Sequence, residues 1–327
     1  MTLPPPFGAD LKTLVLAGSD PPSARARGRA RSTRELPLVD KAFLPLHGQL
    51  VIEYVLDLLL QECGLTRVWV LAPERQLAQI PARHRFIPVP QQPDVPLFAR
   101  LSAGSAAMAV NAGEPALVIF GDHPLTSLKA LQIFLARCSE LLEQADFFHA
   151  LALQAPYREY APWFRRTSVH TREMSGRASG FTLAIPSRLH HLHAFEQLYG
   201  VRKLERLEAL FRLLLHMARW LGTDAPHGIL DSVLLYLAKE MEKAGRGAGA
   251  TIARRLEAWL AARVPVGRLE RYATRVLGAE RGVRLIPVAH GGIAIDVDFA
   301  EELEALEMHW DALCEIAARQ DAALLAQ

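Results

Sequence analysis

LVIFGDHPL, residues 117–125, places one carboxylate directly after a short apolar run. Four consecutive apolar residues bounded by glycine and proline are typical of a strand buried in an α/β sheet. Gly121 loosens the end of this strand, Asp122 follows, and Pro124 turns the chain away. Ligands bind beyond the carboxyl ends of the strands in open α/β sheets, so Asp122 is a candidate metal ligand. The alternative is an aspartate that only caps a turn.

Short apolar runs alternate with helical patterns through the first half of the chain. The predicted strands are residues 11–18, 68–71, 86–89, 116–120, 145–153 and 179–185. The predicted helices are residues 49–63, 97–111 and 126–142, the last capped by Thr126 or Ser127. This alternation predicts an α/β fold with a mostly parallel, Rossmann-like sheet flanked by helices.

The second half of the chain is predominantly helical before the strand pattern returns. Helical patterns occupy residues 206–221, 229–243, 251–263 and 266–277. Apolar runs at 283–288 and 293–297 then predict two strands, and a closing helix begins at Phe299. We therefore predict a core at 1–195, a helical insertion at 196–282, and C-terminal strands and a helix at 283–327 that complete the core.

Composition narrows the class of protein. Half of the 327 residues are hydrophobic, 22% are charged and the formal net charge is +2, so a large core is expected and nucleic-acid binding is not. The three cysteines are far apart and form no C-x-x-C, which argues against a disulfide framework or a thiolate zinc site. No apolar stretch approaches the roughly 18 residues of a membrane span. These features predict a cytoplasmic protein.

Two other segments accompany the 117–125 motif. KAFLPLHG at residues 41–48 leads into QLVIEYVL at 49–56, and IAIDVDFAEEL at 293–303 carries a D-x-D near the C-terminus. Together and in this order, the three segments resemble the MobA-like nucleotidyltransferases. The resemblance covers roughly residues 11–195 and 283–306. It implies a GT-A-like fold and transfer of a nucleoside monophosphate from an NTP to a phosphorylated sugar, polyol or alcohol, with release of pyrophosphate.

The resemblance also implies a catalytic centre. Lys41 would contact the phosphates as a catalytic cation, and Asp122 and Asp298 would hold Mg²⁺, a hard cation that prefers carboxylate oxygens. Asp296 is the alternative ligand, because alternate residues of a strand face the same side. The implied nucleotide-binding residues are Leu16, Ala17, Gly18, Lys41 and Gly104. The implied acceptor-binding residues are Arg177 and Gly180.

The first loop departs from the family. Gly18 is followed by Ser19-Asp20-Pro21-Pro22, with one glycine where backbone amides should surround phosphates. The following arginines either replace the usual basic residue or form a solvated loop; they are Arg25, Arg27, Arg29, Arg31 and Arg34. The departure motivates an alternative function, a catalytically silent binding or scaffold module. A less favoured alternative is an NDP-sugar glycosyltransferase that uses the D-x-D at 296–298.

The expected partners are an NTP and a phosphorylated small molecule. The leucine runs of the helical insertion most simply form monomer core, with a homodimer contact as the alternative. Arg212, Arg219 and Lys239 on the charged faces suggest a possible peripheral contact with an anionic membrane. His190, His191 and His193 are not expected to bind metal, because their spacing distributes them around a helix.

Overall fold

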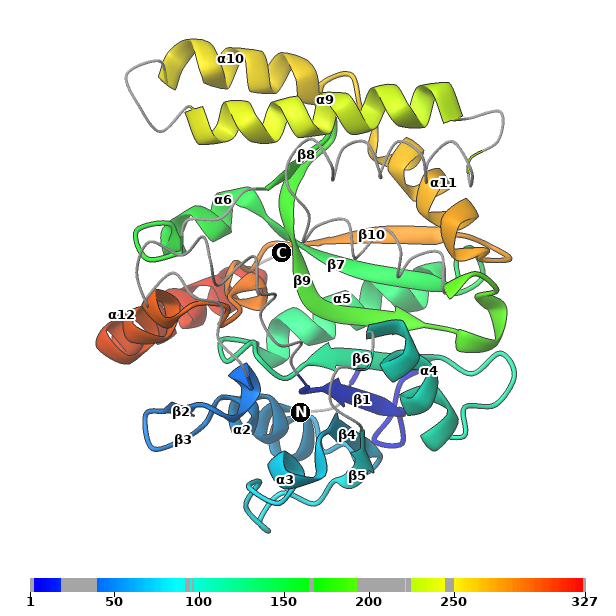
Figure 1. The fold of residues 1–327 in the computed structure, drawn as a ribbon, viewed down its shortest axis with the longest axis vertical. Coiled ribbons are helices and arrows are strands. Elements are labelled where there is room, and N and C mark those ends of the chain that lie inside the picture. The colour runs from blue at the N-terminus through cyan, green and yellow to red at the C-terminus, as the bar shows by residue number, and fades with distance from the viewer. Residues whose placement is uncertain are drawn as a thin grey trace.

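The computed structural model describes residues 3–18, 40–91, 95, 97–164, 168–192, 221, 225–244 and 250–325. An eight-stranded sheet runs through the molecule in the order β10-β7-β9-β6-β1-β4-β5, with β8 paired to β9 (Figure 1). The strands are β1 (Thr13–Leu16), β4 (Val68–Ala72), β5 (Ile87–Pro90), β6 (Ala116–Phe120), β7 (Phe147–Leu153), β8 (Val169–His170), β9 (Ser175–Ala184) and β10 (Val283–Val288).

The sheet is mostly parallel. β1 pairs in parallel with β4 and β6, and the pairs β4–β5 and β7–β10 are parallel as well. β9 lies between β6 and β7 and runs antiparallel to both. Leu16 is level with Leu71 and with Phe120, so the loop after β1 lies beside the loop after β6. The predicted α/β class is confirmed.

Alternate residues of β1 pack into separate clusters, as the two-residue period of a strand requires. Val15 joins the large core under α2 (Val51–Asp57), α5 (Leu128–Leu141) and α12 (Ala300–Leu325). Leu14 and Leu16 join a smaller cluster under α4 (Leu97–Ala107). Helices therefore cover both faces of the sheet. The predicted helix at 49–63 is α2 continued by a π-helical turn, η3 (Leu58–Glu62).

Ser127 is the cap of the predicted helix at 126–142. Its Oγ accepts a hydrogen bond of 3.0 Å from Ala130 N. The same hydroxyl donates to Asp321 Oδ1 at 2.6 Å, which ties the start of α5 to the end of α12. One small side chain thus closes a helix terminus and joins two helices.

The predicted strand at 293–297 is wrong. Residues Gly292–Ala294 form a short 3₁₀ helix, η7, and β10 is the strand that residues 283–327 add to the sheet. Hydrogen bonds from Ala294 N to Gly291 O and from Ile295 N to Gly292 O make the chain turn tightly. The apolar residues are buried without a ladder partner, and a short buried run reads the same as a strand in sequence.

The helical region contains α9 (Ala225–Ala244), α10 (Ala250–Ala261) and α11 (Val266–Leu277). α9 and α10 pack together at the top of Figure 1, next to β8. The buried carboxylate of Asp231 in α9 accepts hydrogen bonds from Arg268 at 2.9 and 3.1 Å and from Tyr272 OH at 2.8 Å, which joins α9 to α11. The predicted helix at 206–221 lies outside the described residues except for Leu221, which is helical.

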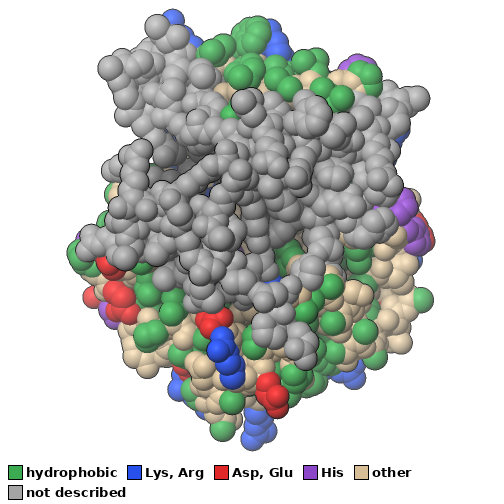
Figure 2. All heavy atoms as spheres, viewed as in Figure 1, with side chains coloured by type: hydrophobic (Ala, Val, Ile, Leu, Met, Phe, Trp, Pro, Cys, Tyr) green, Lys and Arg blue, Asp and Glu red, His purple; other side chains and the backbone are tan. Residues whose placement is uncertain are grey.

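Hydrophobic side chains gather on the surface over α9 and α10 (Figure 2). Among the side chains that the structure describes on these helices, the large exposed ones are Leu230, Leu237, Leu256 and Trp259. No helix in the part of the chain that the structure describes is long and apolar enough to cross a membrane. Arg212 and Arg219 lie outside the described residues. The boundaries at 195 and 282, the homodimer and the membrane contact stay predictions.

Gly291→Ala should destabilise the protein, because residue 291 packs against the backbone of Pro156 and Tyr157. A Cβ at Gly291 would lie 2.7 Å from Tyr157 Cα and 2.9 Å from Pro156 O, and backbone cannot move aside as a side chain can. We expect the free energy of unfolding to fall by about 1–3 kcal/mol, measured by urea denaturation. Gly267→Ala is the matched control, because nothing lies within 4 Å of its added methyl group. Equal stability of the two variants would contradict this packing.

Candidate active site

Asp122 follows β6 in a turn that backbone hydrogen bonds hold from two sides. Gly121 N donates to Leu16 O at 2.9 Å, which joins the turn to the end of β1. Val297 N donates to Asp122 O at 3.2 Å, which joins the turn to a segment near the other end of the sequence. The carboxyl edge of the sheet therefore brings Asp122 close to the segment that carries Asp298.

Lys41 lies between these two carboxylates. It begins a 3₁₀ turn, η2 (Lys41–Phe43), whose Ala42 and Phe43 side chains are buried and anchor the turn. Its Nζ is 3.1 Å from Asp122 Oδ2 and 2.5 Å from Asp298 Oδ1. Three predicted residues from distant parts of the chain thus meet at one point.

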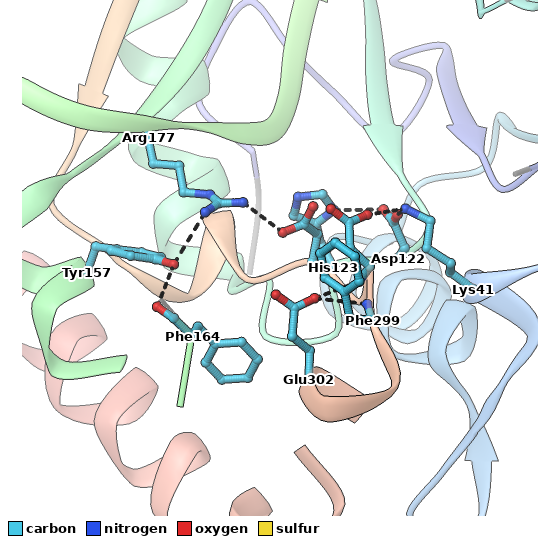
Figure 3. Close-up of polar contacts among 10 residues, drawn as sticks. Lys41, Asp122, His123, Tyr157, Phe164, Arg177, Phe299 and Glu302 are labelled. Carbon is cyan, nitrogen blue, oxygen red and sulfur yellow. Dashed lines mark hydrogen bonds and ion pairs between the residues drawn. The ribbon is translucent and has the colours of Figure 1, made fainter. Parts of the chain in front are cut away.

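Asp298 is positioned by the start of α12. Glu302, in the first turn, accepts hydrogen bonds from Asp298 N at 2.8 Å and from Phe299 N at 3.1 Å (Figure 3). Glu302 therefore binds the backbone amides that precede the helix. The side chain of Asp298 instead extends to Lys41.

Mutual attraction shifts the pKa values of this cluster. Burial favours neutral Lys41, but the negative charges of Asp122, Asp298 and Asp296 outweigh it and hold the pKa of Lys41 above its usual value. Burial likewise favours neutral Asp122, and Lys41 together with a hydrogen bond from His123 overcomes it and holds the pKa of Asp122 well below its usual range. Both groups are charged at neutral pH.

A second ion pair lies beside the first. Arg177, from β9, donates to Asp296 Oδ1 from Nη2 at 3.0 Å. Its Nη1 is 3.4 Å from Tyr157 Oη, and its guanidinium carbon lies 5.6 Å from the centre of the Tyr157 ring. Tyr157 OH donates to Phe164 O at 3.2 Å. Arg177 is thereby held at the opposite end of the cluster from Lys41 (Figure 3).

Figure 3 shows these charges as a row. Arg177 and Lys41 lie at the two ends, and the carboxylates lie between them. The central carboxylates of this row can attract a divalent cation. The positive side chains at its two ends can each attract an anionic group. Among the described residues, no three His, Cys, Asp or Glu side chains gather closely enough to enclose a metal on their own.

Gly18 has two polar neighbours that sequence reasoning missed. Arg100, buried in α4, donates from Nη1 to Gly18 O at 2.7 Å and from Nε to Val95 O at 2.6 Å. A Cβ on Gly18 would lie 1.9 Å from Gln91 Nε2, so a larger residue there would require the end of the Gln91 side chain to move. The sequence contains a pattern that indicates the burial of Arg100. At helical spacing it shares one face with Leu97, Leu101 and Gly104, and that face is apolar.

The other predicted nucleotide residues lie close to this loop. Leu16 O accepts from Gly121 N, and Ala17 N donates to Leu71 O at 3.1 Å, so both backbone groups take part in the sheet. Gly104 is buried in α4, where a Cβ would lie 2.3 Å from Leu14 Cδ2. That glycine allows α4 to pack on β1, and its contact with nucleotide stays a prediction. The five arginines between 25 and 34 lie outside the described residues.

Gly180 and the histidines complete the predicted set. Gly180 lies in β9, where a Cβ would be 3.0 Å from Cγ of His123. His190 Nε2 is 3.0 Å from Glu280 Oε1, and both side chains are exposed, as expected of a surface pair. His193 lies outside the described residues.

Comparison with known proteins assigns the family. Residues 15–212, more than half of the chain, match the family described as the MobA-like NTP transferase domain. The chain belongs to this family. The matched residues include Lys41, Asp122 and Arg177. The inferred family resemblance is confirmed.

Solved structures resemble this MobA-like protein as well. A hypothetical transferase from Thermus thermophilus aligns with a TM-score of 0.57 and 21% identity, over 90% of this chain and 99% of that one. A cytidylyltransferase from Leptospira borgpetersenii aligns at TM-score 0.34 and 15% identity, over 61% and 65% of the two chains. A CMP:2-keto-3-deoxy-manno-octonic acid synthetase complexed with CTP aligns at 0.40 and 15%, over 64% and 86%. The Thermus structure shows a shared fold. No curated protein sequence matches the chain.

Lys41→Met should raise the pKa of Asp122. Removing the ammonium leaves burial as the main influence, and burial favours the neutral acid. The carboxylate should therefore become protonated at a higher pH than in the wild-type protein, as followed by ¹³C NMR of the side-chain carboxyl carbon. Arg137→Met removes an exposed positive charge near the end of α5 and serves as the control. An unchanged titration of Asp122 in Lys41→Met would rule out the close ion pair.

Proposed function

We propose that this protein is a Mg²⁺-dependent nucleotidyltransferase that transfers a nucleoside monophosphate from an NTP to a phosphorylated small acceptor and releases pyrophosphate. The observation that supports this most is the Lys41 ammonium between the carboxylates of Asp122 and Asp298. Membership of the NTP transferase family supplies the general activity. The acceptor class rests on Arg177, the cation at the other end of the row.

The carboxylates fit a divalent cation. Asp122 Oδ2 and Asp298 Oδ1 each approach Lys41 Nζ within 3.1 Å, so their oxygens already converge on one positive charge. Mg²⁺ is commonly held in proteins by one or two carboxylates, with waters and phosphate oxygens as the other ligands. Asp122 and Asp298 would hold the ion, with Asp296 as the alternative ligand. When bound, it would supply counter-charge to the triphosphate.

The reaction is an in-line displacement at the α-phosphorus. A phosphate oxygen of the acceptor forms a bond to the α-phosphorus while the bond from that phosphorus to the pyrophosphate oxygen breaks. No proton transfer is required, because the attacking oxygen is already anionic. Lys41 neutralises charge that moves onto pyrophosphate, and the fixed positions of both substrates account for most of the acceleration.

The two ends of the row bind different substrates in this proposal. The nucleotide lies along the loop of Leu16, Ala17 and Gly18 with its phosphates towards Lys41, and Gly104 lies in the adjacent helix. The acceptor phosphate lies at Arg177, whose planar guanidinium can bind two phosphate oxygens at once. Gly180, on the same strand, permits close approach of the acceptor. Arg177 would exchange Asp296 for this phosphate.

We place this activity in the cytoplasm. Cys63, Cys138 and Cys314 are free thiols, and two of them are buried. Free cysteines agree with a reducing compartment.

Asp122→Asn should lower turnover by at least about a hundredfold, because it removes the charge that attracts Mg²⁺ and keeps the shape of the side chain. CTP, GTP, ATP and UTP are first tested one at a time for binding with Mg²⁺, and pyrophosphate release is then measured with sugar, polyol and alcohol phosphates. Asp57→Asn, in α2 and also partly exposed, is the control. Wild-type turnover in Asp122→Asn would refute the proposal. Nucleotide binding without pyrophosphate release for any acceptor would favour the silent module.

Arg177→Gln should raise the KM for the acceptor about 10- to 100-fold, which corresponds to loss of a charge-assisted hydrogen bond. The KM for the NTP should stay near its wild-type value, because Arg177 lies at the other end of the row from Lys41. Arg177→Lys keeps the charge but loses the planar guanidinium. Its KM for the acceptor should therefore lie between the values of the wild-type protein and Arg177→Gln. A larger effect on the NTP than on the acceptor would reverse the assignment of the two ends.

A further inference from the structure

His123 is the polar neighbour of Asp122 within the same turn. Its carbonyl oxygen accepts from Thr126 Oγ1 at 2.8 Å and from Thr126 N at 3.3 Å, and Pro124 restricts the backbone between them. β6 has ended at Phe120, so successive side chains no longer alternate between faces. His123 and Asp122 therefore point towards each other (Figure 3).

The imidazole binds the Asp122 oxygen that does not face Lys41. Nδ1 of His123 is 3.0 Å from Asp122 Oδ1, whereas Oδ2 is the oxygen near Lys41. Asp122 is ionised beside Lys41, so the proton in the histidine contact belongs to Nδ1. Each carboxylate oxygen thus has its own partner, which fixes the rotation of the carboxylate plane.

The histidine ring is itself confined. His123 is 7% exposed, and its ring lies 6.1 Å from that of Phe120. On another side it lies against Gly180, where a Cβ would approach Cγ at 3.0 Å and Cδ2 at 3.1 Å. Those distances are tighter than ordinary contacts, so any larger residue at 180 would displace the ring. Glycine at this position gives the ring its place.

We propose that His123 is a positioning residue, which holds Oδ1 of Asp122 so that Oδ2 faces the divalent cation. Gly180 contributes by leaving room for the His123 ring. The inference rests on the proposed function, because it presumes that Asp122 binds a divalent ion. It gives Gly180 a use that does not involve the acceptor. Hydrogen-bond partners of metal ligands commonly account for 10- to 100-fold in metal affinity, which sets the size of the expected effect.

The test measures Mn²⁺ binding by electron paramagnetic resonance, without nucleotide or acceptor. His123→Phe keeps a ring of similar size but cannot donate, and should weaken Mn²⁺ binding about 10- to 100-fold. His123→Asn places an amide NH₂ where Nδ1 stood and should restore most of the affinity. Asp122→Asn sets the lower limit. His170→Phe is the control, because it removes a histidine that is 1% exposed and whose Nδ1 is 3.1 Å from Ser175 Oγ, not from Asp122.

Gly180→Ala tests the same proposal independently, even if the His123→Phe variant does not fold. Its methyl group should push the His123 ring and weaken Mn²⁺ binding by less than His123→Phe does. In the His123→Asn background the smaller side chain leaves room, so the same change should have no effect. Equal effects of Gly180→Ala in both backgrounds would overturn the link between the two residues.

The outcomes separate this inference from the proposed function. Wild-type Mn²⁺ affinity in His123→Phe, with weakened binding in Asp122→Asn, would overturn the positioning role alone. Equally weak binding in His123→Phe and His123→Asn would overturn it too, since the donor would then be irrelevant. Unchanged binding in Asp122→Asn would overturn both proposals.

Discussion

The site depends on one partly buried electrostatic constraint, the ammonium of Lys41 held between Asp122 and Asp298. Removing one member of such a cluster leaves the others charged and partly out of water, which costs more than the cluster contributes when complete. The three residues are supplied by a 3₁₀ turn, a strand end and the segment before the last helix. The packing of these segments has to be mutually consistent, because an error in any one would leave a carboxylate unpaired.

Much of the fold followed from sequence periodicity. The alternation of apolar runs with helical patterns predicted the sheet, and the position of Asp122 after a strand followed from a glycine and a proline. The prediction of a strand at 293–297 failed because a run of buried apolar residues has the same sequence pattern in a strand and in a tight turn. What distinguishes them is Gly291 and Gly292, which pack against the backbone of Tyr157 and Leu125, and such contacts are not encoded locally.

The candidate site was predicted unevenly for a similar reason. Lys41, Asp122 and Asp298 belong to motifs whose order along the chain carries information. Arg100 and His123 act through neighbours in space, and a single sequence shows only neighbours along the chain. Gly180 illustrates the difference, since its conformational freedom was apparent from the sequence but the ring that occupies the adjacent space was not.

The hydrogen bond from Val297 N to Asp122 O also has a consequence for synthesis of the protein. A ribosome makes the chain from its N-terminus, so β6 and its neighbours emerge long before residue 297. β10 reaches its partner β7 only after more than a hundred intervening residues, and closing so long a loop is slow. Until then, the nascent chain has the strand that bears Asp122 but no Asp298 beside it. The cluster of Lys41 with both carboxylates is therefore completed only after residue 298 has been synthesised and its segment has folded onto the sheet.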